Sequence, residues 1–231
     1  MTDRAPIVFL FDVDNTLLDN DAVQADLSAH LERELGLASR ERYWQIFEEL
    51  RAELGYADYL GALQRCRLEH PDDMQLLRIS FFLLDYPFAH RLYAGAMEAL
   101  ERCRTLGPTV LLSDGDVVFQ PRKVQRAGLW DAVQGRVLIY LHKERMLADV
   151  ARRYPAGHYV MVDDKLRILT AMKQVWRERL TTIFPRQGHY ALDAREVAGL
   201  PAADVTLAAI GELASVPLPA LSGAGHPQRL R

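Results

Sequence analysis

The sequence has 231 residues, of which 49% are hydrophobic and 26% are charged. This length and composition suffice for one large core, or for one core with a smaller second domain, and they exclude an intrinsically disordered chain. The 28 Lys and Arg residues face 31 Asp and Glu residues, which leaves a net charge of -3. The chain therefore has no general positive field for nucleic acid or an anionic membrane, and an anionic ligand requires a local site.

Cysteine use and hydropathy indicate a cytoplasmic protein. Cys66 and Cys103 are the two cysteines, and both lie in stretches of helical pattern, which is typical of a reduced compartment. The apolar run near the N-terminus is about six residues long, too short for the core of a signal peptide. No later run approaches the length of a membrane span, so we expect neither secretion nor membrane insertion.

The chain opens on a strand and then becomes entirely helical. Residues 7–11 form a continuous apolar run, which predicts a strand buried on both faces, as in a parallel sheet. From about residue 20 to residue 87 apolar side chains recur at helical spacing, with Gly36 and Gly55 as stop signals. The four helices predicted there cover residues 23–35, 43–54, 58–70 and 72–84.

Strands and helices alternate after Tyr93. This alternation predicts right-handed crossovers and a doubly wound, parallel, Rossmann-like sheet, so the fold class is α/β. The predicted strands cover residues 109–112, 137–141, 158–162, 180–184 and 205–208. The predicted helices cover residues 95–106, 119–127, 143–153 and 166–179, with a last short segment at 210–214.

The helical block is therefore an insertion directly after the first strand. We expect a Rossmann-like core made of residues 1–19 and 88–216, with an inserted all-α domain at residues 20–87. Residues 217–231 contain several prolines and glycines and are expected to form a poorly ordered tail.

Chemically active side chains are expected where the strands end, because ligands of parallel sheets bind outside the carboxyl ends of the strands. Converging carboxylates repel one another and raise each other's pKa values unless a cation compensates, and Mg2+ prefers such oxygen ligands. Together with an amine, such a cluster suits a phosphoryl group. Lys143 is the favoured amine, because it begins a helix after the third strand; Lys123 and Lys165 are its competitors, with a solvated surface position as the alternative for both. The strand-end side chains are those of Asp12, Asp14, Ser113, Asp114, Lys143, Asp163 and Asp164.

Four segments resemble the motifs of the haloacid dehalogenase superfamily of hydrolases, most of whose members are phosphatases. Residues 12–16 match the motif Asp-x-Asp-x-Thr, and residues 109–113 match an apolar strand that ends in Ser or Thr. Lys143 matches the third motif, at the start of a helix, and residues 160–164 match the fourth. The motifs occur in the right order, and the resemblance spans residues 7–211.

The resemblance implies a role for each of these residues. Asp12 would attack phosphorus and form an aspartyl-phosphate intermediate, and Asp14 would protonate the leaving oxygen and then deprotonate the hydrolytic water. Ser113 and Lys143 would bind the phosphoryl oxygens, with Asp114 as a further substrate contact. The implied ligands of Mg2+ are Asp12, the backbone carbonyl of Asp14, and Asp164.

Two departures from the family pattern leave alternatives open. Asp163 occupies a place that is often Gly, and Ile168 stands where another acid is usual. Either Asp163 or Asp164 is therefore the direct metal ligand, and we favour Asp164, with Asp163 behind it. Asp116 adds negative charge beside the expected phosphate site, where it either binds a cationic substrate group or caps the helix that starts near Phe119.

The inserted helical block resembles the mobile cap of the family, which closes over the site and contributes substrate contacts. Arg51 and Tyr56 are candidates for such contacts. The loop at residues 186–189 is polar enough to face the same crevice.

The sequence thus predicts a cytoplasmic, Mg2+-dependent phosphatase that hydrolyses a small phosphomonoester. Asp14 favours a phosphatase, because a halide leaving group needs no acid and dehalogenases of this superfamily lack that aspartate. Three alternatives stay open: a phosphotransferase or mutase on the same intermediate, cleavage of a carbon–halogen or carbon–phosphorus bond, and a binding protein that has lost turnover. We expect no nucleic-acid or membrane partner, and the sequence specifies neither the substrate nor the oligomeric state.

Overall fold

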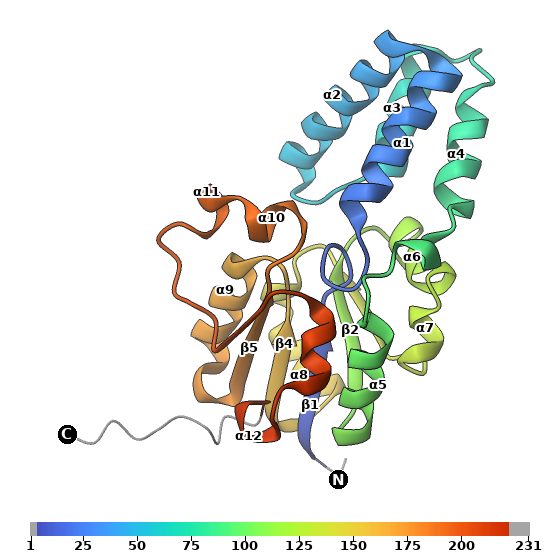
Figure 1. Cartoon of the computed structure of the whole chain (residues 1–231). Helices are drawn as coiled ribbons and strands as arrows, with labels where there is room; N and C mark the ends of the chain where they lie inside the picture. Colours follow the sequence, from blue (N-terminus) through green and yellow to red (C-terminus); the bar gives the residue numbers. More distant parts are fainter. Residues whose placement is uncertain (1–3, 222–231) are drawn as a thin grey trace.

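In the computed structural model, which describes residues 4–221, six strands form one parallel sheet in the order β3-β2-β1-β4-β5-β6 (Figure 1). After β1 the chain adds β2 and β3 on one side of it, and then adds β4, β5 and β6 on the other side. This confirms the predicted doubly wound, Rossmann-like sheet and places the topological switch point between β1 and β4. The strands are β1 (Ala5–Phe11), β2 (Thr109–Asp114), β3 (Val137–Tyr140), β4 (Ala156–Val162), β5 (Leu180–Pro185) and β6 (Val205–Leu207).

The side chains of the central strand β1 are apolar on both faces of the sheet, and a hydrophobic cluster covers each face. Phe9 and Phe11 pack into the hydrophobic cluster on one side of the sheet, and Val8 and Leu10 pack into the cluster on the other. Successive side chains of a strand point to opposite faces, so a strand buried on both sides needs an unbroken apolar run.

Helices form a layer on each face of the sheet. The layer over Phe9 and Phe11 contains α5 (Ala96–Leu106), α6 (Phe119–Arg126), α7 (Leu129–Ala132) and η4 (Ile210–Ser215). The layer over Val8 and Leu10 contains α8 (Leu147–Arg153) and α9 (Leu166–Trp176). The short elements that remain are η1 (Phe88–Arg91), η2 (Lys143–Arg145), η3 (Arg177–Arg179), α10 (Gly188–Leu192), α11 (Ala194–Val197) and α12 (Leu218–Leu221).

Four helices follow β1 before the sheet resumes. In Figure 1 they stand together beyond the end of the sheet at which β1 finishes. Gly36 lies between the first two, and Gly55 ends the second in a left-handed conformation, as the sequence predicts. The four helices are α1 (Asn20–Leu35), α2 (Leu37–Leu54), α3 (Tyr59–Glu69) and α4 (Leu76–Asp85).

The chain enters and leaves this helical block through two neighbouring segments. Leu18 and Leu92 form an antiparallel bridge. Beside it, the Asp19 N–H donates to the Arg91 carbonyl at 2.7 Å, and the Tyr93 N–H donates to the Leu17 carbonyl at 2.9 Å. The block is therefore joined to the sheet by two hydrogen-bonded connecting segments.

Several predicted helix boundaries are wrong. Helices α1 and α2 begin earlier than predicted, at Asn20 and Leu37. Three further boundaries differ for a local reason. Lys143 begins the short 3-10 helix η2 instead of a long helix, because hydrogen bonds to the third residue back tighten this turn and α8 starts only at Leu147. The Asp73 side chain accepts from the Gln75 N–H, which holds a turn and delays α4. Helix α9 ends at Trp176 because the next residue has a positive φ of 50°.

The predicted tail is partly wrong. Residues 218–221 form the short helix α12, and the Leu221 side chain is fully buried against the core. The Val216 carbonyl accepts a hydrogen bond from Arg102 at 3.1 Å, which fixes the segment just before this helix. Residues 222–231 lie outside the described residues.

Both cysteines are buried and unpaired. Burial raises the pKa of Cys66 to about 11 and that of Cys103 to about 12, so neither thiol is a nucleophile at neutral pH. Within residues 4–221, the helices lack the combination of length and apolar character needed to cross a membrane.

The buried strand β1 gives a direct test of the core. Leu10→Ala should lower the free energy of unfolding by about 2–5 kcal/mol, because Leu10 is fully buried and its truncation leaves a cavity. Leu68 is 81% exposed, so Leu68→Ala should change stability by less than about 0.5 kcal/mol. Urea denaturation followed by circular dichroism measures both, and similar losses would contradict this account of the core.

Candidate active site

Three carboxylates meet where β1 and β4 end. Asp12 follows β1, and its backbone N–H donates to the Val162 carbonyl at 2.9 Å, which holds it beside the residues that follow β4. One oxygen from each of Asp12, Asp163 and Asp164 lies within 4.8 Å of the other two, and all three residues are buried. The parallel register thus joins the first and fourth motifs at one point, as the sequence predicts.

Asp164 is the carboxylate whose oxygens are free. Both are buried and have no hydrogen-bond partner in the described part of the chain. Burial raises the pKa of Asp164 well above its usual value; the neighbouring Asp163 and Asp12 add to this, whereas Lys165 opposes it. A buried carboxylate without a partner is costly, and a hard divalent cation is the ligand that this oxygen cluster fits.

Asp163 is engaged by its neighbours. Its Oδ2 lies 2.7 Å from Lys143 Nζ, and its Oδ1 accepts from the Lys165 N–H at 2.8 Å. Burial and the charge of Asp12 raise the pKa of Asp163, and Lys143 counteracts them.

Lys143 lies between Asp12, the candidate nucleophile, and Asp163 of the fourth motif. Its side chain is 1% exposed, and its ammonium contacts both Asp12 and Asp163. Although burial alone lowers the pKa of this ammonium, Asp12, Asp163 and Asp114 raise it above its usual value, so Lys143 stays charged. The backbone N–H of Lys143 donates to Asp114 Oδ1 at 2.7 Å. Asp114, expected as a substrate contact, is thus bound to the turn that positions Lys143.

Thr16 links the same groups through its hydroxyl, which donates to Asp12 Oδ2 at 3.3 Å and accepts from the Asp164 N–H at 3.0 Å. The turn that carries Thr16 depends on Asn15, whose φ of 59° lies in the left-handed region. The Asn15 Oδ1 accepts from the Asn20 N–H at 2.9 Å. The motif therefore fixes its own turn as well as Asp12.

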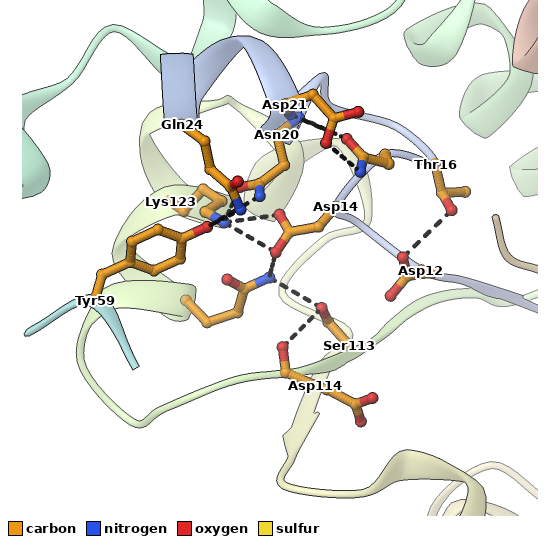
Figure 2. A network of polar contacts seen from close by, with 12 residues as sticks. Asp12, Asp14, Thr16, Asn20, Asp21, Gln24, Tyr59, Ser113, Asp114 and Lys123 are labelled. Atoms are coloured by element: carbon orange, nitrogen blue, oxygen red, sulfur yellow. Dashed lines mark hydrogen bonds and ion pairs between the residues drawn. The ribbon is translucent and has the colours of Figure 1, made fainter. Parts of the chain in front are cut away.

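Asp14 lies in a different environment from Asp12. Figure 2 shows its carboxylate directed toward Lys123 and not toward Asp12. Lys123 Nζ donates to its two oxygens at 2.7 and 2.9 Å, and Gln120 donates to one of them at 3.4 Å. The Asp14 side chain is 26% exposed, whereas Lys123 is fully buried. Of the two alternatives for Lys123, the solvated surface position is therefore excluded.

The contact between Asp14 and Lys123 extends into the helical block. Lys123 Nζ also donates to Asn20 Oδ1 at 2.9 Å, and Asn20 donates to the Tyr59 hydroxyl at 3.1 Å. Gln24 donates to the same hydroxyl at 2.7 Å (Figure 2). A continuous polar network thus connects Asp14 to α1 and α3.

Ser113, at the end of β2, is buried next to this network. Its hydroxyl accepts from Gln120 Nε2 at 2.9 Å and donates to the Asp114 carbonyl at 3.3 Å. Asp116 accepts from the backbone N–H groups of Val118 and Phe119 at 2.8 and 2.6 Å. Of the two alternatives for Asp116, the structure therefore shows capping of α6.

The loop at residues 186–189 packs against the residues of the first motif. Gln187 is buried and donates to the Thr16 carbonyl at 2.8 Å, and the His189 N–H donates to Asp21 at 2.8 Å. Gly188 is required here, because a Cβ would lie 2.4 Å from that of Asn15.

The two candidate substrate contacts of the helical block lie in different hollows. Arg51, on α2, lines a small cavity together with Asp14 and Tyr190. Tyr56 lines a separate hollow together with Asp116 and His142. Only Arg51 is thus brought to the side of Asp14.

Sequence reasoning assigned no role to Thr16, Gln120 or Lys123. A signal for the last two was available: Gln120, Lys123, Val124 and Ala127 form one stripe at helical spacing, and all four are buried. Polar residues on the apolar stripe of a helix indicate a buried polar site.

Comparison with known proteins agrees with this geometry. Residues 8–175 match the family of haloacid dehalogenase-like hydrolases. The chain is 66% identical to a haloacid dehalogenase-like hydrolase from Burkholderia xenovorans LB400, with a TM-score of 0.88 over 91% of this chain and 96% of that one. No curated protein matches the chain.

More distant structures share the fold. L-2-haloacid dehalogenase from Xanthobacter autotrophicus is 20% identical, with a TM-score of 0.59 over 90% of this chain and 96% of that one. The hydrolase YfnB from Bacillus subtilis, whose structure contains magnesium, is 16% identical, with a TM-score of 0.62 over 91% and 97% of the two chains. The chain belongs to the haloacid dehalogenase-like hydrolase family.

The buried Lys123 gives a stability test of the site. Lys123→Met should cost about 2 kcal/mol, less than the 3–5 kcal/mol of a fully buried pair, because Asp14 is partly exposed. The double variant Lys123→Met/Asp14→Asn should recover part of this loss, since the amide carries no charge. Arg104→Met, which breaks an exposed pair with Glu101, is the control and should cost less than about 1 kcal/mol. Urea denaturation measures all three, and a double variant no more stable than the single one would contradict the pairing.

Proposed function

We propose that the chain is a cytoplasmic, Mg2+-dependent phosphatase that hydrolyses a small phosphomonoester through an aspartyl-phosphate on Asp12. The observation that carries this proposal is the second carboxylate, Asp14, held by hydrogen bonds beside the nucleophile candidate but outside the carboxylate cluster. Displacement of an alkoxide needs a group that supplies and removes protons, whereas displacement of a halide does not. Asp14 therefore favours phosphate esters over halides.

Asp12 is the nucleophile in this proposal, and Lys143 prepares its approach. The Lys143 ammonium contacts Asp12 and so offsets the repulsion between that carboxylate and an anionic phosphoryl group. The Asp12 oxygen forms a bond to phosphorus as the bond from phosphorus to the leaving oxygen breaks, and water later hydrolyses the intermediate. Ser113, at the neighbouring strand end, is placed to bind a phosphoryl oxygen.

Asp14 gives a proton to the leaving oxygen and then takes one from the attacking water. In the structure its carboxylate is bound by the Lys123 ammonium. The first step requires the Asp14 side chain to turn from Lys123 toward Asp12. Since the network around Lys123 includes Tyr59, movement of the helical block can release that contact.

The carboxylate cluster supplies the ligands for Mg2+. Asp12, the backbone carbonyl of Asp14 and Asp164 would hold the ion, and Asp164 is preferred to Asp163 because its oxygens have no other partner. When bound, Mg2+ neutralises the carboxylates and the phosphoryl oxygens. The magnesium in the YfnB structure supports this choice of ion.

The reaction can be tested with two classes of substrate. The chain should release phosphate from alkyl phosphates with Mg2+ but not with a chelator, and Asp12→Asn should abolish this. Asp14→Asn should slow an alkyl phosphate about 10²–10⁴-fold but slow 4-nitrophenyl phosphate much less, because that leaving group needs little protonation. Phosphate, halide and sugar phosphate products are measured in parallel.

Three results would contradict the proposal. Halide release from 2-chloropropionate without phosphatase activity would indicate a dehalogenase. Transfer to a sugar hydroxyl without free phosphate would indicate a phosphotransferase or mutase. An equal loss of rate in Asp14→Asn with both esters would show that Asp14 does not transfer the proton to the leaving group.

Metal binding can be tested without turnover. Saturating Mg2+ should stabilise the protein, by about 2.7 kcal/mol at a concentration 100 times Kd. Asp164→Asn should lose this gain, whereas Asp116→Asn, which changes only a helix cap, should keep it. Thermal denaturation with and without Mg2+ measures the shift, and an unchanged gain in Asp164→Asn would exclude Asp164 as a ligand.

A further inference from the structure

A small cavity opens beside the proposed acid–base residue. It has a volume of about 80 Å³ and is lined by Asp14 and by residues of α1, α2 and α10. A water molecule occupies about 30 Å³ of the liquid, so the cavity admits a group of only a few non-hydrogen atoms. The leaving group of a phosphate ester on Asp12 would extend into this space.

Two cations line this cavity. Arg51 lines it from α2, and Lys165 lines it from the segment after β4. Both lie against the ring of Tyr190: Lys165 Nζ is 4.6 Å from the ring centroid, and Arg51 Cζ is 5.8 Å from it. Arg51 also donates to the Tyr190 hydroxyl. A single aromatic side chain therefore holds two positive charges at one small cavity.

These cations are not neutralised by strong ion pairs. Lys165 Nζ forms none with the residues described, 4–221, and its largest favourable interaction is with the carboxylate cluster behind it. Arg51 lies 3.6 Å from Glu48, but the Glu48 side chain is 62% exposed, and such pairs contribute little. Most of the five guanidinium donors of Arg51 stay available.

The acids near the cavity, by contrast, are already paired. Asp14 is bound by Lys123. Asp21 accepts from Asn15 at 2.9 Å and pairs with His189 at 2.5 Å. Glu48 also lines the cavity, but its side chain is 62% exposed and its pair with Arg51 is weak. The two cations therefore outweigh it and leave a net positive charge at the cavity, although the chain as a whole is acidic.

We infer that this cavity binds a carboxylate on the leaving group, so that the enzyme selects short phosphorylated carboxylic acids. The inference rests on the phosphatase proposal and adds a substrate class to it. A carboxylate has two oxygens in the plane that a guanidinium fork matches, and it is small enough for the space. Arg51 is the main contact, and Lys165 supports it.

Three esters of similar size test the inference. In 2-phosphoglycolate the leaving group carries a carboxylate, in 2-hydroxyethyl phosphate a hydroxyl, and in phosphoethanolamine an ammonium. We expect kcat/KM to be at least about tenfold higher for phosphoglycolate than for hydroxyethyl phosphate, with phosphoethanolamine lowest. Arg51→Met should reduce the ratio of kcat/KM for phosphoglycolate to kcat/KM for hydroxyethyl phosphate about tenfold or more. Arg51→Lys, which keeps the charge without the planar guanidinium, should reduce this ratio less.

Arg40→Met is the matched control. Arg40 lies on the same helix and pairs at the surface with Glu32 at 2.5 Å, so its removal should leave the ratio unchanged. Equal kcat/KM values for the three esters, or an unchanged ratio in Arg51→Met, would overturn the inference.

Failure of the phosphatase proposal would give a different result. In that case none of the three esters is hydrolysed, and the Asp12→Asn variant decides the inference by calorimetry. Tighter binding of phosphoglycolate than of hydroxyethyl phosphate, lost in Asp12→Asn/Arg51→Met, would support the carboxylate site without turnover. Equal binding of the two compounds would overturn it.

Discussion

The active site depends on an unbalanced set of buried charges at the end of the central strands. Asp12, Asp163 and Asp164 bring three carboxylates to one point; Lys143 contacts two of them, and Lys165 acts on the third from farther away. When the three carboxylates and Lys143 are ionised, these four buried groups carry a charge of -2. Such an imbalance opposes folding, and a divalent cation cancels it. The same groups that make the metal-free site costly would thus favour a doubly charged metal.

A second pairing separates the two acids of the first motif. Asp12 lies with Lys143 inside the cluster, whereas Asp14 lies with Lys123 outside it. Two carboxylates only two residues apart therefore sit in different electrostatic surroundings, which is the condition for one to act as nucleophile and the other in proton transfer. The network from Lys123 to Tyr59 also makes the surroundings of Asp14 depend on the position of the helical block.

The sequence predicts the parts of this site that strand topology alone determines. The apolar run before Asp12 indicates a central strand, and parallel order then brings Asp163 and Asp164 to the same end. Strand topology does not place Lys123. Its position on the buried stripe of α6 indicates burial, but not that its partner is Asp14. The direction of the Asp114 side chain likewise depends on the tight turn at Lys143, which no periodicity reports. Tertiary contacts decide both cases.

The bridge between Leu18 and Leu92 has a consequence for how this enzyme could diverge. Because the two connections to the helical block lie side by side, the block begins and ends at almost the same place in space. A segment with adjacent ends can be lengthened, shortened or exchanged without pulling on the sheet that carries it. Asp12, Lys143 and Asp164 all lie outside that segment, whereas Arg51 lies within it. The proposed catalytic residues and Arg51, the main contact proposed for the substrate carboxylate, thus lie on different stretches of chain that are free to evolve at different rates.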